Sequence, residues 1–362
     1  MDADKDPGLY YHDYLQLDGL LSVQELESVK HGKPVHDELL FIIVHQAYEL
    51  WFKQILWELD DVLRAFEGDV LNERDQGRVV SRLQRIVAIQ RLLLEQINVL
   101  ETMTPIDFLD FRNYLVPASG FQSWQFRLIE NRLGVRPQDR LLFEGAPYTH
   151  RLNPEHRAIV EAAEKGPTLH DAVDAWLART PFLDEYDFWD EYARAVRSML
   201  DADREVIATN PNLGEDERAD QLRSFEKTIE QFEAAFDPER HAEMVASGAR
   251  RFSHRAFQGA LFISLYRDEP ALQEPHRLLE LLVDVDEGFT TWRYRHALMV
   301  QRMIGAKIGT GGSAGAKYLL RLAERNRAFP DLLLLPTFLV PRSVRPELPR
   351  SLVEKMRFRY QS

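Results

Sequence analysis

The sequence predicts an all-α protein: a large helical bundle built on long antiparallel helices, with a smaller helical insertion. Apolar residues recur at three- and four-residue steps through 37–66 and again through 78–100, and neither segment contains glycine or proline. Two long helices that are neighbours in sequence typically pair antiparallel at the centre of a bundle. Alternating segments of the kind that form strands are hard to find. These patterns favour helices almost throughout.

Turn and capping residues divide the rest of the chain into further helices. Thr104 and Pro105 have the residue types of an N-cap and a first helical position, so a short helix begins there and stops before Pro117. Residues 135–220 alternate short helical patterns with polar stretches, as expected of an insertion or subdomain. The remaining helices are expected at 121–133, 217–236, 253–267 and 274–304, with one more from about Ala316.

Composition limits the chemistry that the chain can carry. Its 45 Lys and Arg against 58 Asp and Glu give a net charge of −13, which argues against nucleic-acid and anionic-membrane partners. The absence of cysteine excludes disulfides, thiolate-held metals and cysteine nucleophiles, so His, carboxylate, Tyr or Met must hold any cofactor. The acidic N-terminus has no secretory pattern and no apolar run approaches the ~20 residues that span a bilayer, which predicts a cytoplasmic protein.

His45 lies on the first long helix, with Phe41 one turn before it and Glu49 one turn after it, so the three side chains share a face. The His–Glu pair could be two metal ligands or a hydrogen-bonded pair on the helix surface. A di-iron carboxylate bundle would need glutamate three residues before a histidine, and none of the 11 histidines has one. His36 and His45 are nine residues apart, which does not fit the His-Glu-x-x-His zinc motif.

His296 belongs to an aromatic and methionine-rich stripe on the helix expected at 274–304. One helical face carries this histidine together with Trp292, Met299, Val300 and Met303. An imidazole in such surroundings is typical of the proximal ligand of a haem. It could equally be a core histidine that is hydrogen-bonded to one backbone group.

A glycine-rich loop spans residues 309–315. It does not follow a strand, as a dinucleotide-binding loop would, and it lacks the Gly-Lys-Ser/Thr of a P-loop. Its backbone N–H groups and the Thr310 hydroxyl could close over a small polar ligand, whereas the simpler interpretation is a connector between two helices.

Arg112 shares a helix face with Phe108. A planar guanidinium beside an aromatic ring is suited to a bidentate grip on a carboxylate at the edge of an apolar slot. The alternative is a surface ion pair with Asp107 or Asp110. The Gly-x-Ser-x-Gly motif is missing, so nothing indicates a serine hydrolase.

Taken together, these segments resemble the tryptophan 2,3-dioxygenase family. Four blocks carry the resemblance: YHDYLQLD at 11–18, HDELLFIIVHQAYELWF at 36–52, LETMTP at 100–105 with PASGFQS at 117–123, and the stretch 292–315 with the WRYRH motif and the glycine loop. They occur in the family's order and cover most of 10–135 and 250–340. The middle third matches mainly in its helical character.

This resemblance implies an all-helical, haem-dependent enzyme, usually a homotetramer, with the haem buried in the bundle. The family inserts both atoms of O2 across the indole C2–C3 bond of L-tryptophan to give N-formyl-L-kynurenine, the first step of tryptophan catabolism by the kynurenine route. The cofactor would be haem b, active in its ferrous form. Alternatives are an indole dioxygenase for a substituted tryptophan, a haem-based oxygen or tryptophan sensor, and a haem-free helical binding module.

The resemblance also implies roles for individual residues on the cofactor side. His296 would be the proximal ligand of the haem iron, Trp292 would also bind the cofactor, and Arg127 and Tyr318 would contact the haem propionates. Ser119 would lie near the bound dioxygen and the distal pocket.

On the substrate side, the resemblance implies that His45 accepts a hydrogen bond from the indole N–H and that Phe41 walls the indole slot together with Phe108. Arg112 would clamp the substrate carboxylate. Thr310 would hold the ammonium group together with a haem propionate.

The resemblance finally implies a division of the chain. Tyr11, Tyr14 and Leu15 match a stretch that reaches into the pocket of a neighbouring subunit, although such a segment could instead pack on its own bundle. We therefore expect an N-terminal segment that reaches a neighbour (1–35), a helical core that binds haem and substrate (36–134 and 221–345), a helical insertion or subdomain (135–220) and a C-terminal tail (346–362).

Overall fold

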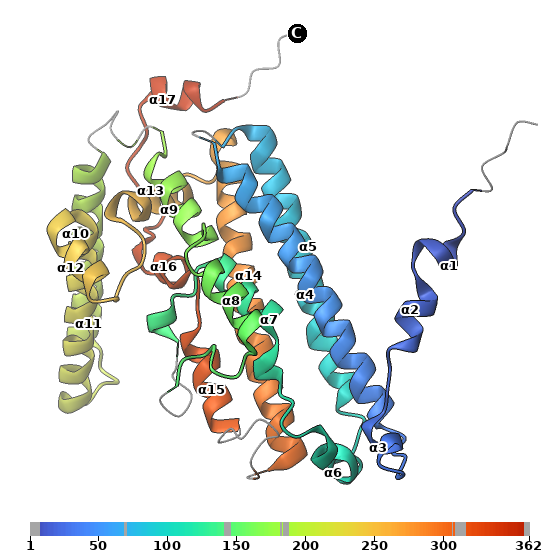
Figure 1. Ribbon diagram of the computed structural model, residues 1–362. Coiled ribbons are helices and arrows are strands. Elements are labelled where there is room, and N and C mark those ends of the chain that lie inside the picture. The colour runs from blue at the N-terminus through green and yellow to red at the C-terminus, as the bar shows by residue number, and fades with distance from the viewer. Residues whose placement is uncertain are drawn as a thin grey trace, which may run out of the picture.

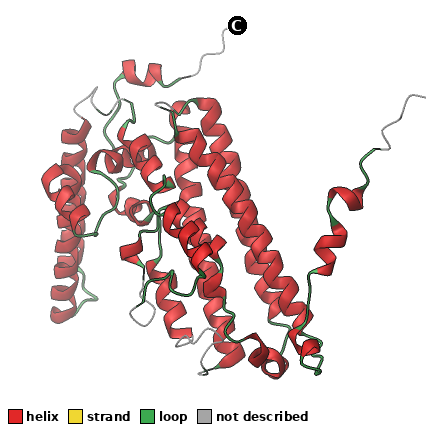
Figure 2. Ribbon diagram, in the orientation of Figure 1, coloured by secondary structure: helices red, strands yellow, loops and turns green. Residues whose placement is uncertain are grey.

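The all-α prediction is confirmed by a computed structural model of the chain. It describes residues 8–68, 71–140, 146–181, 183, 188–305, 307 and 316–357, with the backbone alone at residues 73, 231, 316–318 and 324. Helices make up most of these residues, and no β-strand occurs among them (Figure 2).

Three long helices form the centre of the molecule. Helix α5 (Glu73–Leu100) packs against both α4 (Glu38–Phe66) and α14 (Pro270–Ile304) (Figure 1). Their contact faces consist of the apolar residues at three- and four-residue steps that predicted the helices, and these are almost completely buried. On α5 they are Val79, Leu83, Ile86, Ile89, Leu93, Ile97 and Leu100. Burial of these side chains is the main driving force for the assembly of the bundle.

Capping residues set the boundaries of the helices next to the core. Thr104 forms a capping box with Asp107 and begins α6 (Pro105–Arg112), as predicted. The helix expected from residue 121 begins later, as α7 (Trp124–Leu133). The reason is local: Ser119 first caps the 3-10 turn η2 (Gly120–Gln122), and Ser123 then accepts from the backbone N–H of Phe126 to start the α-helix.

Two long helices begin earlier than the sequence pattern indicated. Helix α5 starts at Glu73 because Asn72 accepts a hydrogen bond from the backbone N–H of Asp75, and it continues through Gly77. Helix α14 starts at Pro270, a favourable first position, and continues through Pro275. The apolar pattern alone missed both starts because the first turn of α5 is polar and because Pro275 interrupts the pattern near the start of α14.

The remaining helices lie at the side and the ends of this core (Figure 1). Helix α13 (His254–Leu265), with Ser253 as its N-cap, packs against α9 (Leu169–Ala178), and α10 (Phe188–Thr209) packs against α11 (Glu215–Phe236). The others are α8 (Pro154–Ala163), α12 (Pro238–Ala246), α15 (Ala316–Arg325), α16 (Pro330–Leu334) and α17 (Arg350–Lys355), with short 3-10 turns η1 (Asn113–Leu115), η3 (Pro137–Asp139) and η4 (Leu335–Phe338). Helix α11 spans the expected boundary at residue 220, and the division into parts stays a prediction.

The N-terminal helices stand apart from the bundle (Figure 1). Helices α1 (Tyr11–Tyr14) and α2 (Leu17–Ser22) bury none of their side chains. Helix α3 (Glu27–Lys30) is tied to the core, because the carboxylate of Glu38 accepts from the backbone N–H groups of Glu27 and Ser28 at 2.8 and 2.9 Å. In the described part of the chain no helix is long and apolar enough to cross a membrane, and the cytoplasmic location stays a prediction.

Candidate active site

A cavity of about 310 Å³ lies between α4, α5, α6, α7, α14 and α15. Its volume is at the lower end of the range for small-molecule sites, and its walls are mostly apolar. The apolar lining consists of Phe41, Tyr48, Phe52, Ile97, Leu100, Met103, Phe108, Phe121, Phe126, Trp292, Met299, Val300, Met303, Ile304, Leu319 and Leu322. A few polar and charged side chains interrupt this lining, and they include both histidines singled out from the sequence.

An aromatic wall closes the cavity between α4 and α6. The ring of Phe41 lies 5.7 Å from that of Phe108 and 5.6 Å from that of Phe111, measured between centroids. Phe108 and Phe111 meet edge to face at 5.4 Å. The His45 ring lies only 4.0 Å from Phe41, so the wall continues directly into the histidine. A flat aromatic ligand would find matching surfaces on this side.

His45 is held in one orientation by its own helix. Its Nδ1 lies 2.7 Å from the backbone carbonyl of Phe41, and because a carbonyl can only accept, Nδ1 must carry the proton. Burial lowers the pKa of His45, against the opposing effects of this hydrogen bond and of the Glu49 charge. The ring is therefore neutral at neutral pH, with Nε2 free of a proton and able to accept a hydrogen bond.

Glu49 does not pair with His45. Its carboxylate accepts a hydrogen bond from Nε2 of Gln125 on α7, at 2.8 Å, whereas His45 forms its hydrogen bond with the backbone carbonyl of Phe41. The mutual hydrogen bond offered for the pair is therefore wrong. Within the described ranges there is also no group of three or more His, Cys, Asp or Glu side chains that could hold a metal ion.

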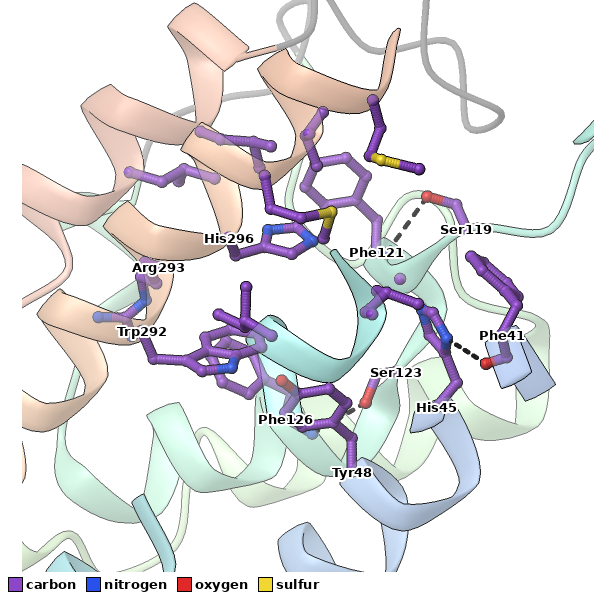
Figure 3. A pocket seen from close by; sticks show the side chains of 18 of the residues that line it. Phe41, His45, Tyr48, Ser119, Phe121, Ser123, Phe126, Trp292, Arg293 and His296 are labelled. Carbon is purple, nitrogen blue, oxygen red and sulfur yellow. Dashed lines mark hydrogen bonds between the residues drawn. The ribbon is translucent and has the colours of Figure 1, made fainter. Parts of the chain in front are cut away.

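His296 faces the same cavity from α14 (Figure 3). Its ring stacks on Trp292, with centroids 5.4 Å apart and planes within 9°. It forms no hydrogen bond with any described residue, so the interpretation as a core histidine with a backbone partner is wrong. Burial, together with the nearby His45, lowers the pKa of His296 to about 4. A neutral imidazole with both nitrogens unsatisfied is thus available as a ligand.

The donor set fits a haem better than a bare metal ion. A protein-bound zinc or iron ion needs three or four protein ligands, whereas a haem iron needs one axial side chain and an apolar pocket for the macrocycle. His296 supplies one imidazole, and Met299, Val300 and Met303 continue the apolar surface along the same helix. Arg127 and Arg293 add positive charge to the lining, as two carboxylate substituents would require.

The other residues predicted from the sequence divide into three groups. Arg112, Ser119 and Arg127 line the cavity, and Ser119 keeps its hydroxyl in the cap of η2. Tyr11, Tyr14 and Leu15 do not line the cavity of their own chain, and they are 70%, 68% and 40% exposed. Thr310 lies outside the described residues, as does the side chain of Tyr318 on α15. The structure therefore brings the predicted site residues of 36–134 that line the cavity together with those of α14.

Three polar residues that line the cavity were not singled out from the sequence. Glu130 and Arg293 line the cavity together with Asn326. A usable signal existed, because Glu130 follows Arg127 by three residues and Arg293 precedes His296 by three, so each lies one turn from a residue that was singled out. Charged residues at such positions on otherwise apolar faces indicate buried ion pairs.

Comparison with known proteins shows the family of the chain. The sequence model of the tryptophan 2,3-dioxygenase family matches residues 1–339. The chain belongs to this family. A tryptophan 2,3-dioxygenase of Bdellovibrio bacteriovorus is 49% identical over 358 residues, which cover 98% of this chain and 100% of that protein. The resemblance inferred from the four sequence blocks is thereby confirmed.

Similar proteins of the same name also occur in organisms other than bacteria. The tryptophan 2,3-dioxygenase of Dictyostelium discoideum is 46% identical over 354 residues, covering 97% of this chain and 88% of the relative. That of Xenopus tropicalis is 48% identical over 345 residues, covering 94% and 84%. Because the matches extend over nearly the whole chain, the family assignment includes the middle third, where the sequence blocks were weakest.

The donor set makes a direct prediction for His296→Ala. We expect haem affinity to fall by at least about 100-fold, because loss of a ligand costs more than the 10–100-fold loss seen for an outer partner of a ligand. The measurement is a titration of haem-free protein with haem, followed by the Soret band.

His276→Ala is the matched control, since His276 lies on the same helix, faces Glu280 at 3.7 Å and does not line the cavity. Equal haem affinity of the two variants would contradict the assignment of His296.

Proposed function

We propose that the chain is a haem-dependent dioxygenase that inserts O2 across the indole C2–C3 bond of L-tryptophan and yields N-formyl-L-kynurenine. The observation that carries the proposal is the placement of His45 and His296, which point from two different helices into one apolar cavity. Membership of the tryptophan 2,3-dioxygenase family supports the same reaction.

His296 would hold haem b, in its ferrous state, through a ring nitrogen. The bound cofactor supplies the reaction with O2, and the protein supplies binding, orientation and exclusion of water. The low pKa of His296, about 4, supports this role because a ligand must be deprotonated at the coordinating atom at neutral pH. Trp292 fixes the plane of the imidazole by stacking on it.

His45 would orient the indole ring. Its Nδ1 proton is donated to Phe41, which leaves Nε2 as an acceptor for the indole N–H. Full removal of that proton is unfavourable because an indole N–H is a very weak acid, so we assign His45 to positioning rather than to obligatory base catalysis. The rings of Phe41 and Phe108 would cover the indole and keep water away from it.

The charged end of the substrate would be recognised by Arg112 and Thr310. Arg112 lies one helical turn from Phe108 and lines the cavity, so its guanidinium can grip a carboxylate while the indole lies against the aromatic wall. The Thr310 hydroxyl would hold the ammonium group together with a haem propionate, and Ser119 would lie near the dioxygen. Arg127 and Tyr318 would contact the propionates.

The test of the reaction uses the haem-loaded protein, reduced without oxygen. Its spectrum is recorded with and without L-tryptophan, air is then admitted, and N-formylkynurenine is followed by its near-ultraviolet absorbance. We expect product only when tryptophan, O2 and reduced haem are all present. A spectral change on tryptophan binding without any product would instead indicate a sensor, and turnover of substituted tryptophans alone would indicate another indole dioxygenase.

Two substitutions separate substrate binding from orientation. Arg112→Leu is expected to raise KM for L-tryptophan by about 10–150-fold, equivalent to the roughly 1.5–3 kcal/mol of a charged hydrogen bond, with a smaller change in kcat. His45→Ala is expected to retain partial turnover, since it removes one orienting hydrogen bond and not a required base. Steady-state kinetics measure both effects.

Arg342→Leu is the control, because Arg342 is exposed and pairs with Asp268 far from the cavity lining. The assignment fails if His45→Ala abolishes turnover while Arg112→Leu leaves KM unchanged.

We further propose a homotetramer in which the N-terminal segment of one subunit completes the site of its neighbour. Tyr11, Tyr14 and Leu15 are large, exposed and separate from their own bundle, which supports a contact with another copy. Substrate would then bind only in the assembled protein.

Mixed oligomers test this exchange. A chain with Tyr11→Ala and Tyr14→Ala is co-produced with a chain that carries His296→Ala, and each alone is expected to be nearly inactive. In a mixed oligomer an intact segment from the second chain can complete the intact haem site of the first, so activity should return in part. Without exchange no site has both intact parts, and mixing would restore nothing.

A further inference from the structure

A buried ionic cluster lies beside the candidate haem pocket. Its centre is Glu130 on α7, whose side chain is 1% exposed. One carboxylate oxygen accepts from Arg293 at 2.8 Å and from the side-chain amide of Asn326 at 3.1 Å, and the other accepts from Arg127 at 3.0 Å. Arg140 approaches the same carboxylate at 3.6 Å. One carboxylate thus connects α7, α14 and the segment that follows α15.

The cluster stays ionised at neutral pH. Burial raises the pKa of Glu130, but the charges of Arg140, Arg127 and Arg293 outweigh this effect and lower it to about 2. Hydrogen bonds between charged partners are short, directional and roughly twice as strong as neutral ones. Removal of one partner leaves the others buried without compensation, so the geometry of the cluster is strongly determined.

Arg293 connects this cluster to His296. It lies three residues before the histidine on α14, so the two side chains leave the helix only about 60° apart around its axis. Besides Glu130, its guanidinium donates to the backbone carbonyl of Asn326 at 3.0 Å and lies 5.6 Å from the ring of Phe126. These three contacts connect α14 at this level to α7 and to the segment that follows α15.

The His296 ring needs an orienting contact of this kind. A histidine that binds a metal usually donates its second N–H to a carboxylate or a carbonyl, which fixes the direction of the ring. Among the described residues His296 has no such acceptor, and its ring stacks on that of Trp292. The helix that carries the ring therefore contributes to its direction beside Trp292, and Arg293 ties that helix to Glu130 one turn away.

We propose that Glu130, acting through Arg293, is a positioning residue that sets the direction of the His296 imidazole in the cavity. The proposal rests on the proposed role of His296 as the haem ligand. The cluster would then affect the bond between His296 and the haem iron, apart from any effect on the stability of the fold.

The test compares Arg293→Met with Arg295→Met in the haem-loaded protein. Arg295 lies on the same helix and pairs with Asn98 and Glu101 at 3.1 and 3.3 Å, but it does not line the cavity. We expect Arg293→Met to release haem about 10–100-fold faster to an excess of apomyoglobin, the range for loss of an outer partner of a metal ligand. Because Arg293 also lines the cavity, loss of its charge can by itself speed release, so the state of the iron–imidazole bond decides between the two effects. The iron–imidazole stretching band of Arg293→Met, recorded by resonance Raman spectroscopy on the ferrous protein, should broaden or shift. Arg295→Met should match the unmodified protein in both measurements.

The path through Arg293 is tested by adding Glu130→Gln. If Glu130 acts through Arg293, the double variant should release haem at nearly the rate of Arg293→Met alone, so that the two effects are not additive. Should Glu130→Gln fail to fold by itself, Arg293→Lys replaces it. The single ammonium group of the lysine can reach the Glu130 carboxylate but not the Asn326 carbonyl as well. The rate of haem release from Arg293→Lys should then fall between those of Arg293→Met and the unmodified protein.

Two outcomes would overturn the inference. The first is an Arg293→Met variant whose haem release rate and Raman band are both unchanged. The second is an Arg293→Met variant that unfolds at a lower temperature while its Raman band stays the same, which would make the cluster purely structural. Failure of the proposed haem site looks different, because His296→Ala would then retain haem with the same band.

Discussion

The structure depends on one unusual constraint, a neutral imidazole held inside an apolar cavity without a hydrogen-bond partner in the described part of the chain. His296 faces the cavity without a hydrogen-bond partner among the described residues, and burial together with the nearby His45 lowers its pKa to about 4. Coordination of haem iron would satisfy one nitrogen and fill the apolar space around it. The cavity lining, the low pKa of His296 and the stacking on Trp292 are all consistent with a site built for that purpose.

The two sides of the cavity carry different polar groups. On the α4 side, His45 is fixed through the carbonyl of Phe41 and sits in an aromatic wall that suits a flat ring. On the α7 side, Glu130 gathers guanidinium groups that suit anionic substituents and that also anchor α14. An asymmetric cavity of this kind can place an aromatic substrate on one side and a charged cofactor edge on the other.

Much of this could be predicted from the sequence, for identifiable reasons. The spacing of apolar residues is local, so it predicted the central helices, and the capping pair Thr104–Asp107 began α6 where its residue types indicate. His45 and Phe41 are one turn apart on one helix, which is why the sequence already placed them together. The stripe around His296 likewise predicted a residue that faces an apolar site.

The rest depended on long-range contacts that no local pattern specifies. The partner of Glu49 is Gln125, 76 residues away, and the partner of Glu130 is Arg293, 163 residues away. Sequence spacing therefore suggested a His45–Glu49 pair and missed the cluster around Glu130. The starts of α5 and α14 were missed for a different reason, since the first turn of α5 is polar and Pro275 lies near the start of α14.

The most direct test of the account is a crystal structure of the ferrous, haem-loaded protein grown without oxygen and with L-tryptophan. We predict a macrocycle in the cavity, its iron bonded to a ring nitrogen of His296, and the indole on the His45 side with its N–H within hydrogen-bond distance of Nε2. A haem bonded through His45, or a His296 ring turned onto the main chain with no macrocycle beside it, would contradict the account.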